Sequence, residues 1–135
     1  MGGSRKKIII AEDDTAEQEF IKAGFERSGV FDIVTIVPNG HKLVGTLESL
    51  SEKELPDVIL SDINMPLMNG YEALVKVKKN PALSEIPFVI FSTSKEENTK
   101  NTSLQLGAKN FMIKPENLDD YENFAKELYA LTGIK

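Results

Sequence analysis

The chain has 135 residues, which suits one domain large enough to bury a hydrophobic core without disulfides. It contains no cysteine and a single histidine, so disulfide frameworks, thiol catalysis, thiolate metal sites and multi-histidine metal sites are excluded. The net charge of -5 argues against broad binding to nucleic-acid phosphates, and no apolar stretch approaches the roughly 20 residues of a membrane span. We therefore expect a cytoplasmic protein that contacts neither DNA nor membrane.

Strand-like and helix-like segments alternate along the chain. Apolar runs bounded by turn residues predict strands, and apolar residues three or four positions apart predict helices. In chain order the predicted elements are a strand at residues 7–11, a helix at 15–28, a strand at 31–37, a helix at 41–50, a strand at 58–61, a helix from about 70 to 80, a strand at 87–91, a helix at 95–106, a strand at 110–113 and a helix at 118–131. Residues 1–5 are expected to be a disordered or added leader, and residues 6–135 a single domain.

The same spacing predicts which face of each helix is buried. In the first helix the predicted core residues are Ala16, Phe20, Ala23 and Gly24. In the last helix they are Leu118, Tyr121, Phe124, Ala125, Leu128 and Leu131. The helix at 95–106 has the weakest pattern, because Leu104 and Leu106 are its clear apolar anchors in an otherwise polar segment.

Five strands alternating with five helices predict a three-layer, doubly wound α/β fold with a parallel sheet. The strands are almost continuously apolar, as expected for strands covered on both faces. Right-handed crossovers favour the flavodoxin-like strand order 2-1-3-4-5, which makes the first and third strands neighbours. Ligands bind at the carboxyl ends of the strands at such a point.

Chemically useful side chains stand where four of the predicted strands end. Glu12 and Asp13 follow the first strand, Asp62 the third, Ser92 the fourth and Lys114 the fifth. Because the carboxyl ends of parallel strands share one edge of the sheet, we expect these groups to form one site. Clustered carboxylates repel one another and favour a bound cation, and oxygen ligands without histidine or cysteine favour Mg²⁺ or Mn²⁺.

The same groups suit phosphoryl transfer. A carboxylate such as Asp62 can act as a nucleophile and form an aspartyl phosphate. Lysine pairs with phosphate oxygens as a point charge, and a small hydroxyl can donate one further hydrogen bond. A metal, a nucleophile, a cation and a hydroxyl are the working parts of that chemistry.

Four segments carry a resemblance to a known family. They are IIIAEDD at residues 8–14, PDVILSDINMPLMNG at 56–70, IPFVIFSTS at 86–94 and LGAKNFMIKP at 106–115. Each segment alone is weakly specific, but the four occur in order and each lies at a predicted strand end. The chain resembles a response-regulator receiver domain of two-component signalling, similar to the stand-alone chemotaxis-type regulators, from about Lys6 to Leu131.

The resemblance implies roles for the acidic residues. Asp62 takes the position of the phospho-accepting aspartate. Asp13 is expected to bind Mg²⁺ directly and Glu12 through water, and Asn64 takes the position whose backbone carbonyl is a metal ligand in the family. Asp14 is a third acid, to which we assign helix capping or a general contribution to the local field rather than ligation.

The resemblance also implies roles at the fourth and fifth strands. Lys114 takes the position of the phosphate-pairing lysine, which the family usually joins to the following proline, here Pro115, by a cis peptide bond. Ser92 stands at the hydroxyl position, where threonine is frequent, and Thr93 follows where alanine is frequent, which would narrow access to the acyl phosphate. Phe111 takes the position of the switch aromatic residue.

The expected function is therefore that of a phosphorelay receiver. Asp62 would take a phosphoryl group from a phosphohistidine on a sensor histidine kinase or a phosphotransfer protein, with Mg²⁺ or Mn²⁺ present. Ser92 and Lys114 would contact the new phosphoryl group, and Phe111 would turn inward. The surface formed by residues 95–106, 110–113 and 118–131 would then change its preference for a downstream protein. The chain would catalyse only its own phosphorylation and dephosphorylation, so calling it an enzyme is a matter of definition.

Two other functions use the same residues. A haloacid-dehalogenase-type phosphatase also has a strand-end aspartate nucleophile, Mg²⁺ and a lysine. Such enzymes normally carry a second aspartate two residues after the first, a position held here by Asn64, and they are usually longer. The other alternative is a pseudo-receiver that serves as a binding module without being phosphorylated.

Overall fold

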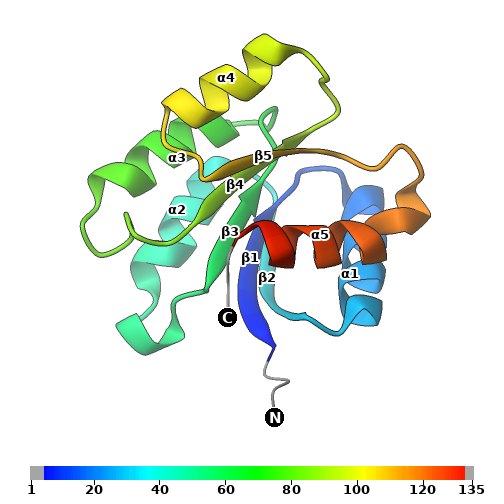
Figure 1. Cartoon of the computed structure of the whole chain (residues 1–135). Helices are drawn as coiled ribbons and strands as arrows, with labels where there is room; N and C mark the ends of the chain where they lie inside the picture. Colours follow the sequence, from blue (N-terminus) through cyan, green and yellow to red (C-terminus); the bar gives the residue numbers. More distant parts are fainter. Residues whose placement is uncertain (1–4, 133–135) are drawn as a thin grey trace.

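The computed structural model describes residues 5–132, in which five β-strands and five α-helices alternate (Figure 1). The strands are β1 (Lys6–Ala11), β2 (Phe31–Val37), β3 (Val58–Ser61), β4 (Phe88–Ser92) and β5 (Asn110–Ile113). The helices are α1 (Thr15–Ser28), α2 (Gly40–Ser49), α3 (Gly70–Lys79), α4 (Glu97–Gln105) and α5 (Tyr121–Leu131), with two short 3-10 helices, η1 (Glu52–Glu54) and η2 (Leu118–Asp120). The predicted alternation is confirmed, and the last predicted helix divides into η2 and α5.

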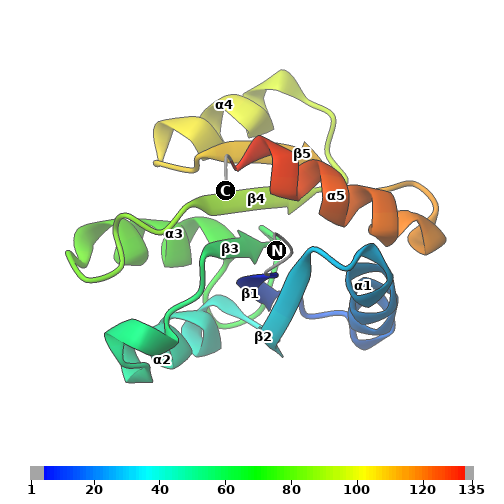
Figure 2. The same cartoon turned by 60° about the horizontal axis from the view of Figure 1, so that its bottom comes forward.

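The five strands form one parallel sheet in the order β2-β1-β3-β4-β5, as predicted. Figure 2 shows α1 and α5 on one side of this sheet and α2, α3 and α4 on the other. The fold is therefore the three-layer, doubly wound α/β arrangement, with β1 and β3 adjacent where the direction of winding changes.

Alternate strand residues supply two separate cores. Ile8 and Ile10 of β1 point to the side of α1 and α5, where they pack in one buried cluster with Phe25. Ile9, between them, belongs to the cluster under α2 and α3 that includes Leu74. All five side chains are fully buried, which explains why the strands are apolar at consecutive positions.

The buried face of α1 differs from the prediction by one position. Phe20 is 38% exposed, whereas its neighbour Ile21 and Phe25 are fully buried. Gly24 is buried as predicted, and an added Cβ atom there would stand 2.5 Å from the Cβ atom of Tyr121 in α5. The inward-facing positions of the helix are 21, 24, 25 and 28. The two alanines of the predicted face, Ala16 and Ala23, are exposed.

Of the two leucines predicted to anchor α4, Leu106 packs against the core under α2 and α3, and polar contacts replace the other. Leu104 is 39% exposed, and the buried residue of the helix is Ser103. The Ser103 hydroxyl donates to the Thr99 carbonyl at 2.9 Å, and the Tyr71 hydroxyl of α3 lies 3.3 Å from Ser103 Oγ and 3.2 Å from the same carbonyl. Leu118 and Leu131, at the two ends of the last predicted helix, are also exposed.

No helix within residues 5–132 has both the length and the apolar character needed to cross a bilayer.

Candidate functional site

The backbone carries four strand ends to one edge of the sheet. The Asp62 amide donates to the Ala11 carbonyl at 3.0 Å, and the Lys114 amide donates to the Ser92 carbonyl at 2.8 Å. The Glu12 amide likewise donates to the Val37 carbonyl at 2.9 Å. These bonds continue the sheet pairing one residue beyond the strands, so the side chains of the predicted site begin from rigid backbone.

Three carboxylates meet at this edge. Glu12, Asp13 and Asp62 each offer one oxygen atom, and the three atoms lie within 4.8 Å of one another. Glu12 and Asp62 are buried, while Asp13 is exposed to solvent at the mouth of the site. Three carboxylate oxygens that converge from two adjacent strand ends can hold a hard divalent cation, which is the ligand chemistry that the sequence predicts.

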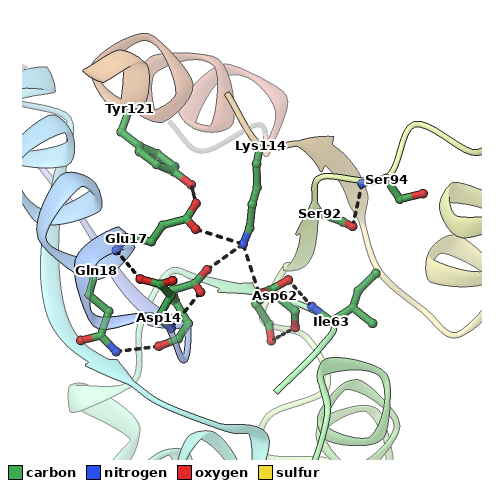
Figure 3. A network of polar contacts seen from close by, with 11 residues as sticks. Asp14, Glu17, Gln18, Asp62, Ile63, Ser92, Ser94, Lys114 and Tyr121 are labelled. Carbon is green, nitrogen blue, oxygen red and sulfur yellow. Dashed lines mark hydrogen bonds and ion pairs between the residues drawn. The ribbon is translucent and has the colours of Figure 1, made fainter. Parts of the chain in front are cut away.

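The Lys114 ammonium lies among these acids. Its Nζ atom is 2.9 Å from Glu12 Oε1 and 3.1 Å from Asp62 Oδ2 (Figure 3). It also lies 4.9 Å from the centre of the Phe91 ring, and its side chain is 8% exposed. The lysine therefore reaches back across β4 to the acceptor position, as its place at the end of β5 requires.

Burial raises the pKa of both buried acids. Desolvation raises the pKa of Glu12 to about 7, although the hydrogen bond and charge of Lys114 oppose the shift. Desolvation also raises the pKa of Asp62, against the charge and hydrogen bond of Lys114 and the Ile63 amide that donates to Oδ1 at 2.7 Å. Burial lowers the pKa of Lys114, but its bonds and charge pairs with Glu12 and Asp62 outweigh burial and leave that pKa raised.

The hydroxyl and the aromatic residue lie further from the acids. Ser92 is buried at the end of β4, where its Oγ atom accepts a hydrogen bond from the Ser94 amide at 3.1 Å. Phe111 is half-buried in β5 and packs against the core under α2 and α3. In the β4–β5 register Phe111 pairs with Ile90, whereas Ser92 pairs with Ile113, so the two predicted switch residues are two positions apart along the strands.

Asn64 and Asp14 lie in the loops that follow β3 and β1. Asn64 is exposed, two residues past Asp62 on the way to α3. Asp14 caps α1, with its side chain accepting from the Glu17 amide at 2.9 Å, which confirms the capping role. The expected cis bond before Pro115 is wrong for this structure, because residues 5–132 contain no cis peptide bond.

Two residues of the site escaped the sequence prediction. Glu17 of α1 is a third acid on the lysine, with Oε1 at 3.5 Å from Lys114 Nζ. Its other oxygen, Oε2, accepts a hydrogen bond of 2.5 Å from the Tyr121 hydroxyl. Tyr121 was predicted as plain core, yet a tyrosine in a buried helical stripe needs a partner for its hydroxyl, and that requirement was the available signal.

The sequence is similar to those of known response regulators. The family model for the response regulator receiver domain matches residues 8–126. The chain is 36% identical over 115 residues to the two-component response regulator ORR11 of Oryza sativa, which covers 85% of this chain and 76% of that protein. It is 30% identical over 118 residues to the response regulator Rcp1 of Synechocystis, which covers 85% and 80%.

Solved structures show the same fold. The crystal structure of the phosphorylated cyanobacterial phytochrome response regulator RcpA has a TM-score of 0.81 to this chain, 32% identity, and coverage of 93% of this chain and 92% of that one. The Mn²⁺-bound form of Rcp1 has a TM-score of 0.78, 27% identity, and coverage of 96% and 97%. The phosphatase and the unphosphorylated binding module are not favoured by these matches. Fold, acidic site and family match agree, and the chain belongs to the receiver-domain family of two-component response regulators.

Proposed function

We propose that Asp62 is the phospho-acceptor of this receiver domain. The observation that carries the proposal is the position of its buried carboxylate, which lies between the Lys114 ammonium, 3.1 Å from Oδ2, and the carboxylates of Glu12 and Asp13. A carboxylate so placed has a cation beside it to pair with the oxygens of an incoming phosphoryl group.

The proposed donor is a phosphohistidine on a sensor histidine kinase or a phosphotransfer protein. An Asp62 carboxylate oxygen forms a bond to phosphorus while the bond between phosphorus and the donor imidazole nitrogen breaks. The imidazole keeps the electron pair and takes up a proton, and the product is an acyl phosphate on Asp62. Lys114 pairs with the phosphoryl oxygens during transfer, and Ser92 donates a hydrogen bond to one of them.

We further propose Mg²⁺ as the resident cation. Asp13 and Asp62 would hold it directly, with the backbone carbonyl of Asn64, and Glu12 would bind it through water. A bound Mg²⁺ would offset the repulsion between the carboxylates and the incoming phosphoryl oxygens. The acidic cluster and the Mn²⁺ in the structure of Rcp1 support a divalent cation, and the absence of histidine and cysteine ligands supports a hard one.

The proposed output follows from the groups around Ser92. Its hydroxyl now accepts from the Ser94 amide, in the loop that leads to α4. Drawing that hydroxyl toward a phosphoryl group would give up this bond, free the loop, and leave room for Phe111 to turn inward. The surface of α4, β5 and α5 would then bind a downstream protein differently.

We also propose that the receiver domain extends over residues 6–135 and that it acts in the cytoplasm.

The test is phosphorylation by a small donor. The protein is incubated with Mg²⁺ and acetyl phosphate, and its intact mass is measured for wild type and Asp62→Asn. The matched control is Asp57→Asn, at the other end of β3, where the Asp57 carboxylate accepts from the Lys7 amide. We expect one phosphate-sized adduct on wild type and on the Asp57 variant, and none on the Asp62 variant. An adduct that survives Asp62→Asn would overturn the assignment, and rapid turnover of varied phosphate esters would favour a phosphatase instead.

A further inference from the structure

Glu17 differs from the other two acids on Lys114. Glu12 and Asp62 belong to the cluster of oxygens that can hold a cation, whereas Glu17 lies outside that cluster. A divalent cation at those oxygens would weaken the attraction of Glu12 and Asp62 for the lysine, whereas the Glu17 carboxylate, 3.5 Å from Lys114 Nζ, would keep its full charge. Figure 3 shows Glu17 and Asp62 reaching the ammonium from different sides.

Tyr121 holds Glu17 in this position. The tyrosine is fully buried, and its hydroxyl donates to Glu17 Oε2 at 2.5 Å. Tyr121 itself has little freedom to move, because its Cβ atom lies against Gly24 at the closest approach of α1 and α5. Burial and then the hydrogen bond to Glu17 raise the pKa of Tyr121 well above its usual range, so the phenol stays protonated and remains a donor. Two packed helices thus fix one carboxylate on the α1 side of the lysine.

The phosphoryl group changes the competition for this lysine. The acyl phosphate has lost the negative charge of the Asp62 carboxylate and gained about two negative charges on the phosphoryl oxygens. These oxygens need the ammonium on the side of Asp62, whereas Glu17 attracts it toward α1. An ammonium has three N–H donors, but it occupies one position at a time. That position is set by the attraction of all the anions around it.

We propose that Glu17, held by Tyr121, is a positioning residue that competes with the phosphoryl group for Lys114 and thereby weakens the binding of a phosphoryl-sized anion at Asp62. This inference rests on the proposed function of Asp62. It assigns the phosphorylation site a component in α1 and α5, outside the strand ends. Removing either the Glu17 charge or its tyrosine tether lets the lysine settle closer to the phosphoryl oxygens.

The test measures binding of beryllium fluoride, a small anion of phosphoryl shape, by calorimetry in the presence of Mg²⁺. Wild type and Asp62→Asn come first: binding to both, or to neither, would mean that the proposed acceptor site itself is wrong. With binding to wild type alone established, Glu17→Gln and Tyr121→Phe are compared with it. The matched control is Glu19→Gln, which removes the same charge from an exposed position of α1 that pairs with Lys22.

We expect Glu17→Gln to bind beryllium fluoride more tightly by roughly threefold to tenfold, the range of a partly screened charge pair. Tyr121→Phe removes no charge, and we expect a smaller tightening in the same direction, with no further gain when it is added to Glu17→Gln. Glu19→Gln should match wild type. If Glu17→Gln bound beryllium fluoride more tightly but Tyr121→Phe did not, the charge of Glu17 alone would explain the result. The positioning role would then be overturned. Unchanged or weaker binding in both variants would overturn it too, and thermal unfolding of each variant shows whether packing alone was altered.

Discussion

Gly70 and Asp62 make a backbone contact that leaves no room for a side chain at position 70. A Cβ atom added to Gly70 would collide with the Asp62 carbonyl oxygen, and the Gly70 amide donates to the Ile63 carbonyl at 2.8 Å. The first residue of α3 is therefore packed directly on the backbone of the proposed acceptor. The glycine that looks like a helix-start residue in the sequence also sets the position of Asp62.

Gly70→Ala tests this contact. The added methyl group pushes the Asp62 backbone away from α3, and we expect the free energy of unfolding to fall by about 1–3 kcal/mol, as for overpacking in a core. We also expect the variant to be phosphorylated at Asp62 by acetyl phosphate more slowly than wild type. Urea denaturation and intact-mass kinetics measure the two effects. Gly45→Ala is the control, because nothing lies within 4 Å of a Cβ atom there and alanine favours the helix. Equal behaviour of the two variants would contradict the role of Gly70.

Lys114→Met should destabilise the metal-free protein. The substitution leaves the buried carboxylates of Glu12 and Asp62 without their counter-charge, and breaking a buried pair costs about 3–5 kcal/mol. Mg²⁺ should restore much of this loss, since it supplies positive charge to the same oxygens. Urea denaturation with and without Mg²⁺ measures both quantities.

The control for this substitution is Lys95→Met. Lys95 pairs with Glu116 at 2.8 Å, but both side chains are exposed, so stability should stay close to that of wild type. If Lys114→Met proved no more harmful than Lys95→Met, the buried pairs would not matter as we describe. A loss that Mg²⁺ fails to reduce would argue that the cation binds elsewhere.

Cation affinity should depend on pH near neutrality. Burial raises the pKa of Glu12 to about 7, so this carboxyl gains a proton as the pH falls through that value. The proton and the cation compete for the same group, and the affinity for Mg²⁺ or Mn²⁺ should therefore decrease as the pH is lowered and level off at higher pH. Calorimetric titrations on both sides of pH 7 measure this trend. In Glu12→Gln the step near neutrality should disappear, and a step that persists would assign it to another group.

Tyr71→Phe should loosen α4 while leaving the rest of the fold intact. The substitution removes the hydroxyl that lies 3.3 Å from Ser103 Oγ and 3.2 Å from the Thr99 carbonyl, which are the polar contacts between α3 and α4. We expect a global loss of about 1 kcal/mol, typical of one hydrogen bond. Amide hydrogen exchange should become faster in α4 than in wild type, with the amides of α5 as the internal reference. Uniformly faster exchange would mean that the contact supports the whole domain rather than this helix.

The sequence predicted the sheet well because its strands carry a strong, local signal. Consecutive apolar residues such as Ile8, Ile9 and Ile10 serve two cores at once, and this pattern is hard to mistake for anything else. The convergence of Asp62, Glu12 and Lys114 could be foreseen for the same reason, since strand order alone brings their strand ends together.

The errors arose where tertiary contacts decide the outcome. In α1 the spacing predicted Gly24 correctly, but it chose Phe20 where the helix buries Ile21 and Phe25, which pack with Tyr121 and Phe124 of α5. The buried Ser103 makes polar contacts with the Thr99 carbonyl and with the hydroxyl of Tyr71, which lies 32 positions away in the chain. Glu17 joins the site for a similar reason, because its partners come from β5 and α5.

The lysine among the acids also bears on which cations the site can accept. The ammonium of Lys114 brings one positive charge to the carboxylates of Glu12 and Asp62. A sodium or potassium ion would bring the same charge, without the covalent tether that keeps the ammonium at hand, and so gains nothing by displacing it. A divalent ion would bring a second charge to the same oxygens, and its Coulomb attraction to them would be correspondingly stronger. We therefore expect the Lys114 ammonium to favour divalent over monovalent cations at this site.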